Sequence, residues 1–318
     1  MVPTDNKSTT GLQKKLLVTG ASGFLGWHIC QQATKEWIVY GIHRSHPIAL
    51  KDIYPVKIDL TDPGLFEKTL GEMRPDAVVH TAGATDPNWC QENPEASERV
   101  NVNVTSRLAE WCAEFRIPLV FTSSDLVFEG MDPPYHEDSL TNPVCRYGEQ
   151  KVRAEQTIGE IYPEALVCRM PLMFGWTGSE LNNLDYHVIQ SLGRGETVSL
   201  FTDEYRTPVD GESAAKGILH FLGKARGVLH LGGKTRISRY GMGKKLEDML
   251  GLKESTINPV KQKDIVKPAP RPADVSLNSS KAFGMGYDPM ALDSALEEAI
   301  KNLDAGRRSR LHQGSRPA

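Results

Sequence analysis

Short β-prone runs alternate with longer helical stretches over the first half of this 318-residue chain, and this alternation constrains the fold most strongly. The pattern predicts strands at 14–19, 37–42, 56–60, 76–80, 118–123 and 165–169, and helices at 26–36, 63–73, 95–115 and after Tyr147. Strands separated by helices of this length are typical of right-handed βαβ units and a parallel sheet. We therefore predict an α/β fold with a Rossmann-type doubly wound parallel sheet, which binds ligands at the carboxyl ends of its strands.

A glycine-rich turn follows the first predicted strand directly. Its glycines are spaced GxxGxxG in the run GASGFLG, where the first strand passes into the first helix. Glycines there permit a tight turn and let the backbone approach a pyrophosphate at the helix N-terminus. This is the context that a dinucleotide-binding turn requires, although a plain strand-to-helix turn is the alternative interpretation. The predicted cofactor contacts in the turn are Gly20, Ser22, Gly23, Phe24, Leu25 and Gly26.

The ends of the second and third strands indicate which dinucleotide binds. Folds of this kind that prefer NAD usually carry Asp or Glu after the second strand, for the ribose hydroxyls. This chain has Arg44 there, and a guanidinium could bind a 2′-phosphate through two parallel hydrogen bonds. NADP(H) is therefore the predicted cofactor, with an exposed loop cation as the alternative role for Arg44. Asp59 and Leu60 close the third predicted strand, where the carboxylate could meet the adenine amino group.

Ser124, Tyr147 and Lys151 form the predicted catalytic set. The run FTSS ends at Ser124 beside the fifth predicted strand, and the YxxxK spacing puts Tyr147 and Lys151 on one face of a helix. A free phenol has a pKa near 10, which a nearby ammonium and an oxidised nicotinamide would both lower. Ser124 could hydrogen-bond a substrate oxygen as charge develops on it. YxxxK alone is a frequent chance match, but a strand-end TSS downstream of a glycine turn makes the combination specific.

These motifs together resemble the extended short-chain dehydrogenase/reductase superfamily over about residues 14–301. The matching pieces are GASGFLG, the DL of KIDLTD, HTAG, NVNVT, TSSDLVFEG, PPYHEDSLTNPVCRYGEQK and CRMPLMFG. Within the superfamily the chain is most similar to the dTDP-4-dehydrorhamnose reductase group and its relative, the regulatory β subunit of methionine adenosyltransferase. The marks of that similarity are SDLVFEG followed by PPYHED, then EYRTPV and RPADVSLNSSKAFGMGY. The chain departs from the group at Leu126, where Tyr is frequent, and in NVNVT, which lacks the glycine of NVxGT.

The resemblance implies roles for individual residues. Ser124 would polarise a carbonyl, Tyr147 would be the acid, and Lys151 would hold the nicotinamide ribose. Further cofactor contacts that it implies are Ala82 and Gly83, from HTAG, and Asn101, from NVNVT. The implied reaction is NADPH-dependent reduction of a nucleotide-activated 4-keto sugar.

Two residues outside these motifs are candidate substrate contacts. Trp89 lies in the expected loop 86–91 after the fourth strand and could stack on a base or sugar; an ordinary buried aromatic is the alternative. Arg206 could meet a diphosphate, or could form a surface salt bridge.

Two other functions stay open. One is a nucleotide-sugar epimerase or dehydratase that uses its cofactor transiently, although dehydratases of this superfamily usually carry an acid pair beside the strand-end Ser or Thr. Here the run Ser124-Asp125-Leu126 offers one acid. The other is a non-catalytic NADP-binding regulatory subunit, which could retain both motifs.

The alternation of strands and helices breaks up after Pro171, where glycine, proline and asparagine become frequent. We expect residues 14–170 to form a dinucleotide-binding domain and residues 171–302 a smaller substrate-binding cap over the ligand edge of the sheet. Residues 1–13 and 303–318 are expected to be mobile tails.

Charge and cysteine usage argue against several other classes of protein. The chain has 37 Lys and Arg against 40 Asp and Glu, a net charge of -3 that disfavours broad capture of nucleic acid or an anionic membrane. Its apolar runs are far shorter than the ~20 residues that span a bilayer, and its start carries no signal-peptide core. Five scattered cysteines without CxxC and nine dispersed histidines predict neither a disulfide framework nor a metal site. We expect a cytoplasmic protein, with a homodimer as one option.

Overall fold

Seven parallel strands form the central sheet, in the order β11-β6-β5-β4-β1-β2-β3. Their bounds are β1 Lys15–Thr19, β2 Ile38–His43, β3 Ile53–Lys57, β4 Ala77–His80, β5 Leu119–Ser124, β6 Leu166–Met170 and β11 Gly227–His230. The predicted α/β fold with a Rossmann-type parallel sheet is confirmed. The computed structural model describes residues 13–48, 50–177, 188, 190–192, 194–252 and 257–313, with residues 303–313 as backbone only.

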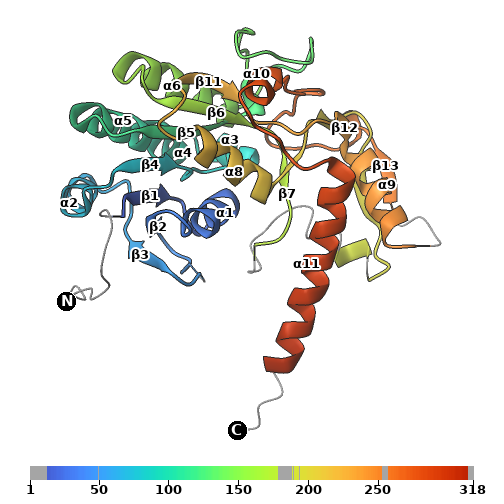
Figure 1. Ribbon diagram of the computed structural model, residues 1–318. Coiled ribbons are helices and arrows are strands. Elements are labelled where there is room, and N and C mark those ends of the chain that lie inside the picture. Colours follow the sequence, from blue (N-terminus) through green and yellow to red (C-terminus); the bar gives the residue numbers. More distant parts are fainter. Residues whose placement is uncertain are drawn as a thin grey trace.

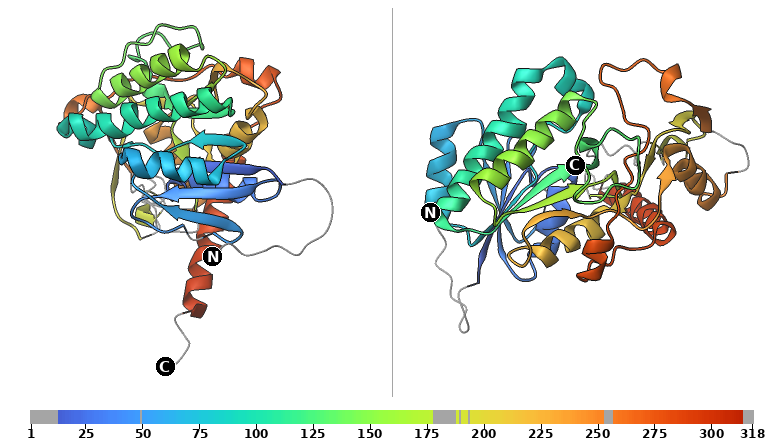
Figure 2. Two further views of the ribbon diagram at one scale, coloured as in Figure 1. Left: turned by 90° about the vertical axis from the view of Figure 1, so that its left-hand side faces the viewer. Right: turned by 90° about the horizontal axis from the view of Figure 1, so that it is seen from above.

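Helices cover both faces of this sheet (Figures 1 and 2). One face carries α1 Phe24–Ala33 and α8 Gly211–Phe221, and the other carries α2 Pro63–Met73, α5 Val104–Phe115 and α6 Arg146–Ile161. Side chains alternate along each strand, so Leu16 and Val18 pack under the first layer while Leu17 packs under the second. The inner strands are buried on both faces and are largely apolar, whereas the edge strand β3 is mostly exposed.

Three local predictions differ from the structure. The third strand begins three residues earlier than predicted, because β3 takes its register from β2, which pairs Val39 with Ile53. The expected loop 86–91 is mostly the short helix α3 Pro87–Glu92, which Asp86 caps by accepting a hydrogen bond from the Asn88 amide. The predicted helix 95–115 is α4 Pro94–Glu98 and α5 joined by a π-helical turn, Arg99–Asn103.

The cap has its own small sheets and apolar core. Its elements are β7 Met173–Phe174, β8 Val198–Phe201, β9 Tyr205–Arg206, β10 Val209–Asp210, β12 Ile237–Ser238, α9 Arg239–Met249, β13 Ile257–Val260 and α11 Leu292–Gln313. Helix α10 Ser280–Gly284 packs instead on the central sheet beside β11. A short 3₁₀ helix in the cap spans Gln262–Asp264, and another, outside the cap, follows β5 at Asp125–Val127. Leu200, Met242, Leu246 and Leu296 pack in the cap core.

The expected division at residue 171 is not a clean boundary in space. The segment 211–230 returns to the sheet, where α8 packs on α1 and β11 pairs with β6. The returning strand extends the sheet at the open edge of β6, which would otherwise leave hydrogen-bonding groups unpaired. Of the expected tails, residues 1–12 and 314–318 lie outside the described residues, whereas 303–313 continue α11, which projects past the rest of the fold (Figure 1).

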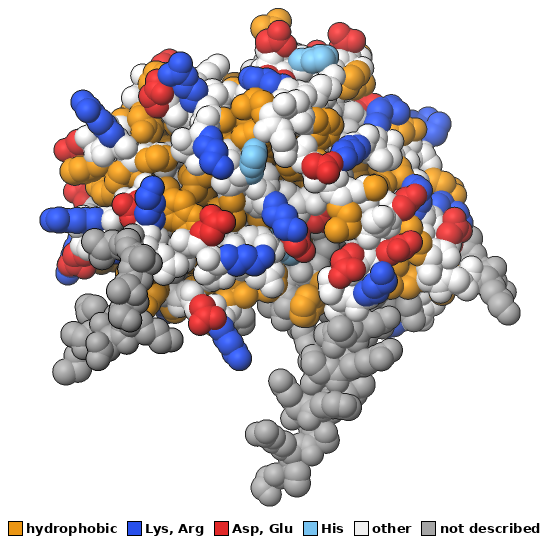
Figure 3. All heavy atoms as spheres, viewed as in Figure 1, with side chains coloured by type: hydrophobic (Ala, Val, Ile, Leu, Met, Phe, Trp, Pro, Cys, Tyr) orange, Lys and Arg blue, Asp and Glu red, His pale blue; other side chains and the backbone are white. Residues whose placement is uncertain are grey.

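Surface charges of both signs are interspersed over the described part of the face drawn in Figure 3. That distribution accords with the near-balance of acidic and basic residues. Within the described ranges, the helices fall short of the length and apolar character needed for a membrane span.

Candidate active site

A cavity of about 690 Å³ opens at the carboxyl ends of β1, β2, β4 and β5. It spans the β1/β4 boundary, where the strand order reverses and where open α/β sheets bind their ligands. Fifteen of the predicted site residues line it: Gly20, Ser22, Gly23, Phe24, Leu25, Gly26, Arg44, Asp59, Leu60, Ala82, Gly83, Trp89, Ser124, Tyr147 and Lys151. Two others, Asn101 and Arg206, are buried elsewhere.

At the glycine turn the backbone lies close to the loop after β4 beside the cavity wall. Gly20 has φ +67°, and a Cβ there would lie 2.7 Å from the Ala82 amide nitrogen in the loop after β4. A Cβ on Gly26 would overlap the Gly20 carbonyl. The turn is closed by the Gly23 amide, which donates to the Gly20 carbonyl at 2.9 Å. The two strand-end loops thus approach closely beside the N-terminus of α1, a setting that suits an anionic phosphate.

We expect Gly26→Ala to lower stability and weaken dinucleotide binding together. The added methyl group can fit only if the backbone of the turn moves, and overpacking of this kind costs about 1–3 kcal/mol. Gly71→Ala in α2 is the matched control, because a Cβ there meets nothing within 4 Å and should stabilise the helix by roughly 0.5–1 kcal/mol. Thermal unfolding and cofactor titration would check both; a Gly26→Ala protein as stable as the Gly71→Ala protein would contradict the prediction.

The far end of the cavity is formed by the loops after β2 and β3. Arg44 is exposed and lines the wall with its neighbours His43, Ser45 and His46. Asp59 accepts hydrogen bonds from the Thr61 hydroxyl at 2.7 Å and the Thr61 amide at 2.9 Å. These bonds, and the charge of Arg44, lower the pKa of the Asp59 carboxyl, so it is ionised at neutral pH.

Ser124 ends β5, and its hydroxyl has two hydrogen-bond partners. It donates to Asp125 Oδ1 at 3.1 Å and accepts from the Leu126 amide at 3.2 Å. Ser124 and Tyr147 line the same cavity. The strand end therefore brings Ser124 to the phenol, as the sequence predicted.

Lys151 lies one helical turn beyond Tyr147 on α6, and both side chains are buried. Its ammonium donates to the Thr122 carbonyl at 2.8 Å and sits 4.5 Å from the centre of the Phe121 ring and 5.8 Å from that of Tyr147. Burial lowers the pKa of Lys151 to about 8, against the opposing effect of the Glu155 carboxylate.

The pKa of Tyr147 differs from the expected direction. Burial raises it above the ordinary value for a phenol, and the neighbouring Ser124 hydroxyl only partly offsets this. Lys151 does not reverse the shift because its ammonium is directed to the Thr122 carbonyl and the Phe121 face. The phenol is consequently protonated at neutral pH and ready to act as a proton donor.

Asn101, a predicted cofactor contact, does not line the cavity, and its side chain hydrogen-bonds to the loop after β4. Its side chain accepts from the Ala84 amide at 2.8 Å and donates to the Ala84 carbonyl at 3.0 Å and to Gln150 at 2.9 Å. A Cβ on Gly83 would lie 3.1 Å from its Oδ1. The π-helical turn carries Asn101 toward this loop, which a motif match could not show.

Trp89 and Arg206, the predicted substrate contacts, have different surroundings. Trp89 is 41% exposed on α3 and lines the cavity, so it is available to a ligand rather than packed in a core. Arg206 is 5% exposed and ion-paired with Asp125 and Glu204, so it is neither a wall of the cavity nor a surface salt bridge.

Sequence reasoning missed part of the wall. Met170, Pro171 and Met173 complete the cavity after β6. The sequence could have indicated these three residues, because they follow the sixth predicted strand and therefore lie at the same edge of the sheet. Within the described ranges, no three His, Cys, Asp or Glu side chains gather closely enough to hold a metal ion.

The cavity fits a dinucleotide in size and in chemistry. Its volume is within the ~300–1,000 Å³ of ligand pockets. The glycine turn lies beside the start of α1, the Arg44 cation lies at the far end, and Ser124, Tyr147 and Lys151 lie at the near end. The glycines suit the pyrophosphate of a dinucleotide, Arg44 suits a further phosphate, and the near end suits the nicotinamide ring.

Several known proteins are similar to this chain over most of its length. The chain is 29% identical over 298 residues to the "Probable low-salt glycan biosynthesis reductase Agl14" of Haloferax volcanii, covering 91% of this chain and 99% of that protein. It is 25% identical to methionine adenosyltransferase 2 subunit beta of Bos taurus, covering 86% and 83% of the two chains. A crystal structure of dTDP-4-dehydrorhamnose reductase from Bacillus anthracis in complex with NADP shares the fold, with a TM-score of 0.80, 21% identity and coverage of 92% and 100%. Residues 14–305 match the family described as RmlD substrate binding domain, so the protein belongs to that family.

Proposed function

We propose that this protein is an NADP(H)-dependent oxidoreductase of the extended short-chain type that reduces a nucleotide-activated 4-keto sugar. The observation that carries the proposal is the meeting of Ser124, Tyr147 and Lys151 at one end of a cavity whose other walls suit a dinucleotide. The relative from Haloferax volcanii is by its name a glycan biosynthesis reductase, and the structure from Bacillus anthracis is a complex with NADP. Both names support this class of cofactor and substrate.

In the proposed reaction the carbonyl oxygen of the sugar lies between the hydroxyls of Ser124 and Tyr147. The reduced nicotinamide, when bound, supplies hydride to the carbonyl carbon. Tyr147 gives its proton to the oxygen, so that C=O becomes CH–OH. Ser124 donates a hydrogen bond to the oxygen as negative charge develops there. Lys151 binds the nicotinamide ribose through its ammonium.

The protonation states of the described side chains suit reduction. A phenol whose pKa is raised by burial holds its proton until an alkoxide, which is a far stronger base, forms beside it. Lys151, with its pKa lowered to about 8, still carries its charge at neutral pH.

The substrate is proposed to lie between Trp89 and the cap. Trp89 offers an exposed aromatic face beside the reactive end of the cavity, which suits a base or sugar ring. We propose residues 171–302, apart from the returning segment 211–230, as the substrate-binding part of the protein. We also propose a cytoplasmic location, since all five cysteines are free and buried.

Dehydration of the sugar is less well supported than reduction. The single acid beside Ser124 is Asp125, which is 4% exposed, does not line the cavity and is ion-paired with Arg206. It therefore has no path to a hydroxyl of a bound sugar.

Cofactor choice gives a direct prediction. Arg44→Asp should weaken NADPH binding by about ten- to a hundredfold while sparing NADH, because it removes a charge-assisted hydrogen bond to the 2′-phosphate. The matched control is Lys51→Asp, which makes the same change of charge at an exposed residue that does not line the cavity. Fluorescence titration with both cofactors would check this; equal affinities of the unaltered protein for NADPH and NADH would contradict it.

A second candidate function has its own supporting observation. The relative from Bos taurus is by its name a subunit of methionine adenosyltransferase, so a regulatory role for this chain is the alternative to catalysis. The two are separated by assaying NADPH oxidation with a panel of 4-keto nucleotide sugars and by affinity capture from lysate. Turnover without a stoichiometric partner supports the reductase; a stoichiometric enzyme partner without turnover supports the regulatory subunit.

A further inference from the structure

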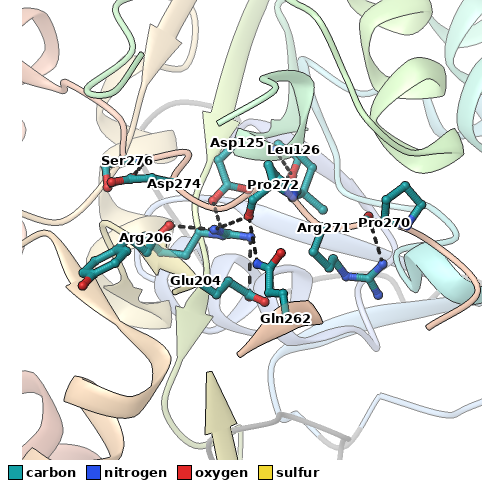
Figure 4. Close-up of polar contacts among 12 residues, drawn as sticks. Asp125, Leu126, Glu204, Arg206, Gln262, Pro270, Arg271, Pro272, Asp274 and Ser276 are labelled. Atoms are coloured by element: carbon teal, nitrogen blue, oxygen red, sulfur yellow. Dashed lines mark hydrogen bonds and ion pairs between the residues drawn. The ribbon is translucent and has the colours of Figure 1, made fainter. Parts of the chain in front are cut away.

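A buried ion pair joins the cap to the strand that ends at Ser124. Arg206 Nε on β9 lies 3.4 Å from Asp125 Oδ2, and the two side chains are 6% and 5% exposed. Figure 4 shows the guanidinium reaching from the cap to the carboxylate. Ionised groups are seldom buried so fully unless each has a partner, so the pair depends on both members.

The cap fixes Arg206 through several further contacts. Its guanidinium pairs with Glu204 at 3.4 Å and donates to the carbonyls of Tyr205 at 2.6 Å and Pro272 at 3.5 Å. Gln262 donates to the same Pro272 carbonyl at 3.3 Å. All of these partners belong to the cap, so the position of Arg206 follows the position of the cap.

Asp125 transmits that position to Ser124. Its Oδ2 faces Arg206 while its Oδ1 accepts the hydroxyl proton of Ser124 at 3.1 Å. A serine hydroxyl has one proton and two lone pairs, and here one lone pair accepts the hydrogen bond from the Leu126 amide. The proton of the Ser124 hydroxyl points at Asp125.

The ion pair with Arg206 also affects the charge on Asp125. Burial raises the pKa of the Asp125 carboxyl to about 6, and Arg206 opposes that rise, so the group is mostly ionised at neutral pH. A free carboxylate would hold the Ser124 proton strongly. Because the guanidinium draws negative charge toward Oδ2, the hydroxyl can turn its proton from Oδ1 to another oxygen.

We propose that Asp125 and Arg206 are positioning residues, through which the seated cap orients the Ser124 hydroxyl for the substrate carbonyl. Asp125 fixes the place of the oxygen, and Arg206 lets the proton turn to the substrate. The proposal rests on the proposed reductase function and adds to it a link between cap and chemistry. It also gives a role to the Arg206 side chain, which does not line the cavity.

A double-mutant cycle tests the link. Ser124→Ala should lower kcat by about 10²–10³-fold, as loss of one oxyanion donor does. Asp125→Asn keeps the shape and removes the charge, and should lower kcat by about tenfold or more through misplacement of Ser124. In the Ser124→Ala protein, Asp125→Asn should have no further effect on kcat, because it acts only through that hydroxyl. Arg206→Gln should resemble Asp125→Asn, and Arg206→Lys, which keeps the charge, should restore part of the rate.

Arg236→Gln is the matched control. Arg236 lies beside β12, the strand that pairs with β9, and its ion pair is with Asp274 rather than with Asp125. It should leave kcat within about twofold, and all variants should keep the NADPH affinity of the unaltered protein. Additive losses from Asp125→Asn and Ser124→Ala, or an unchanged kcat in Asp125→Asn, would overturn the proposal.

Crystal structures of Asp125→Asn and Arg206→Gln separate this proposal from the proposed function. If the unaltered protein reduces no 4-keto nucleotide sugar, the proposed function fails, but the position of Ser124 in these variants can still be observed. A displaced Ser124 oxygen supports the positioning role, and an oxygen that stays in place overturns it.

Discussion

Replacing Tyr147 by Phe should lower kcat by about 10²–10⁴-fold, the contribution that general acid catalysis typically makes. The substitution removes the phenolic proton and keeps the ring, which is buried beside Cys90 and Cys145. NADPH affinity and thermal stability should therefore change little. Steady-state kinetics, cofactor titration and thermal unfolding of the same preparation would check all three expectations.

The matched control for this substitution is Tyr162→Phe. Tyr162 caps the C-terminal end of the same helix, α6, and does not line the cavity. The Tyr162→Phe protein should keep the kcat of the unaltered protein. If Tyr147→Phe retained most of its kcat, Tyr147 would not be the proton donor, and the regulatory alternative would gain support.

Lys151→Met should damage cofactor binding and alter its pH dependence together. The ammonium makes a charge-assisted contact, so its removal should weaken NADPH binding by about ten- to a hundredfold. Because burial lowers the pKa of Lys151 to about 8, the unaltered protein should lose NADPH affinity as the pH rises through that value and the charge disappears. Lys151→Met should bind weakly at every pH without that decline.

Two further variants sharpen the Lys151 experiment. Lys151→Arg keeps a charge that does not titrate near pH 8, so the decline in affinity should be absent while binding is partly retained. Lys216→Met removes an exposed lysine that is paired with Glu212 on α8, and should change neither affinity nor its pH dependence. A Lys151→Met protein with lower thermal stability but normal NADPH affinity and normal pH dependence would assign Lys151 a purely structural role.

The part of the fold that repeats could be predicted from the sequence. Apolar runs that alternate with helices specify a parallel sheet, because helices on both sides bury its inner strands. The place of the strand Gly227–His230 in this sheet could not be predicted, since it follows more than fifty residues after β6 and joins the sheet only through pairing in space. Local hydrophobicity does not encode such a return of the chain.

The candidate site divides in the same way. The sequence identifies Gly20 because a tight turn requires glycine, and it identifies Tyr147 and Lys151 because their spacing puts them on one face of a helix. The surroundings of Asn101 and Arg206 could not, because a motif gives the presence of a polar side chain but not the direction in which it points. Asn101 supports a loop, and Arg206 lies in a buried ion pair.

Transfer of deuterium from NADPH that carries two deuterium atoms at the reactive carbon of its nicotinamide tests the central claim most directly. The protein would be mixed with a 4-keto nucleotide sugar and the labelled cofactor, and the sugar product examined by mass spectrometry and NMR. We predict one deuterium at C4 of the product for each NADPH consumed, with the signal lost in Tyr147→Phe and retained in Tyr162→Phe. A product without deuterium, or an isomerised sugar formed with no net consumption of NADPH, would contradict the assignment of this protein as a reductase.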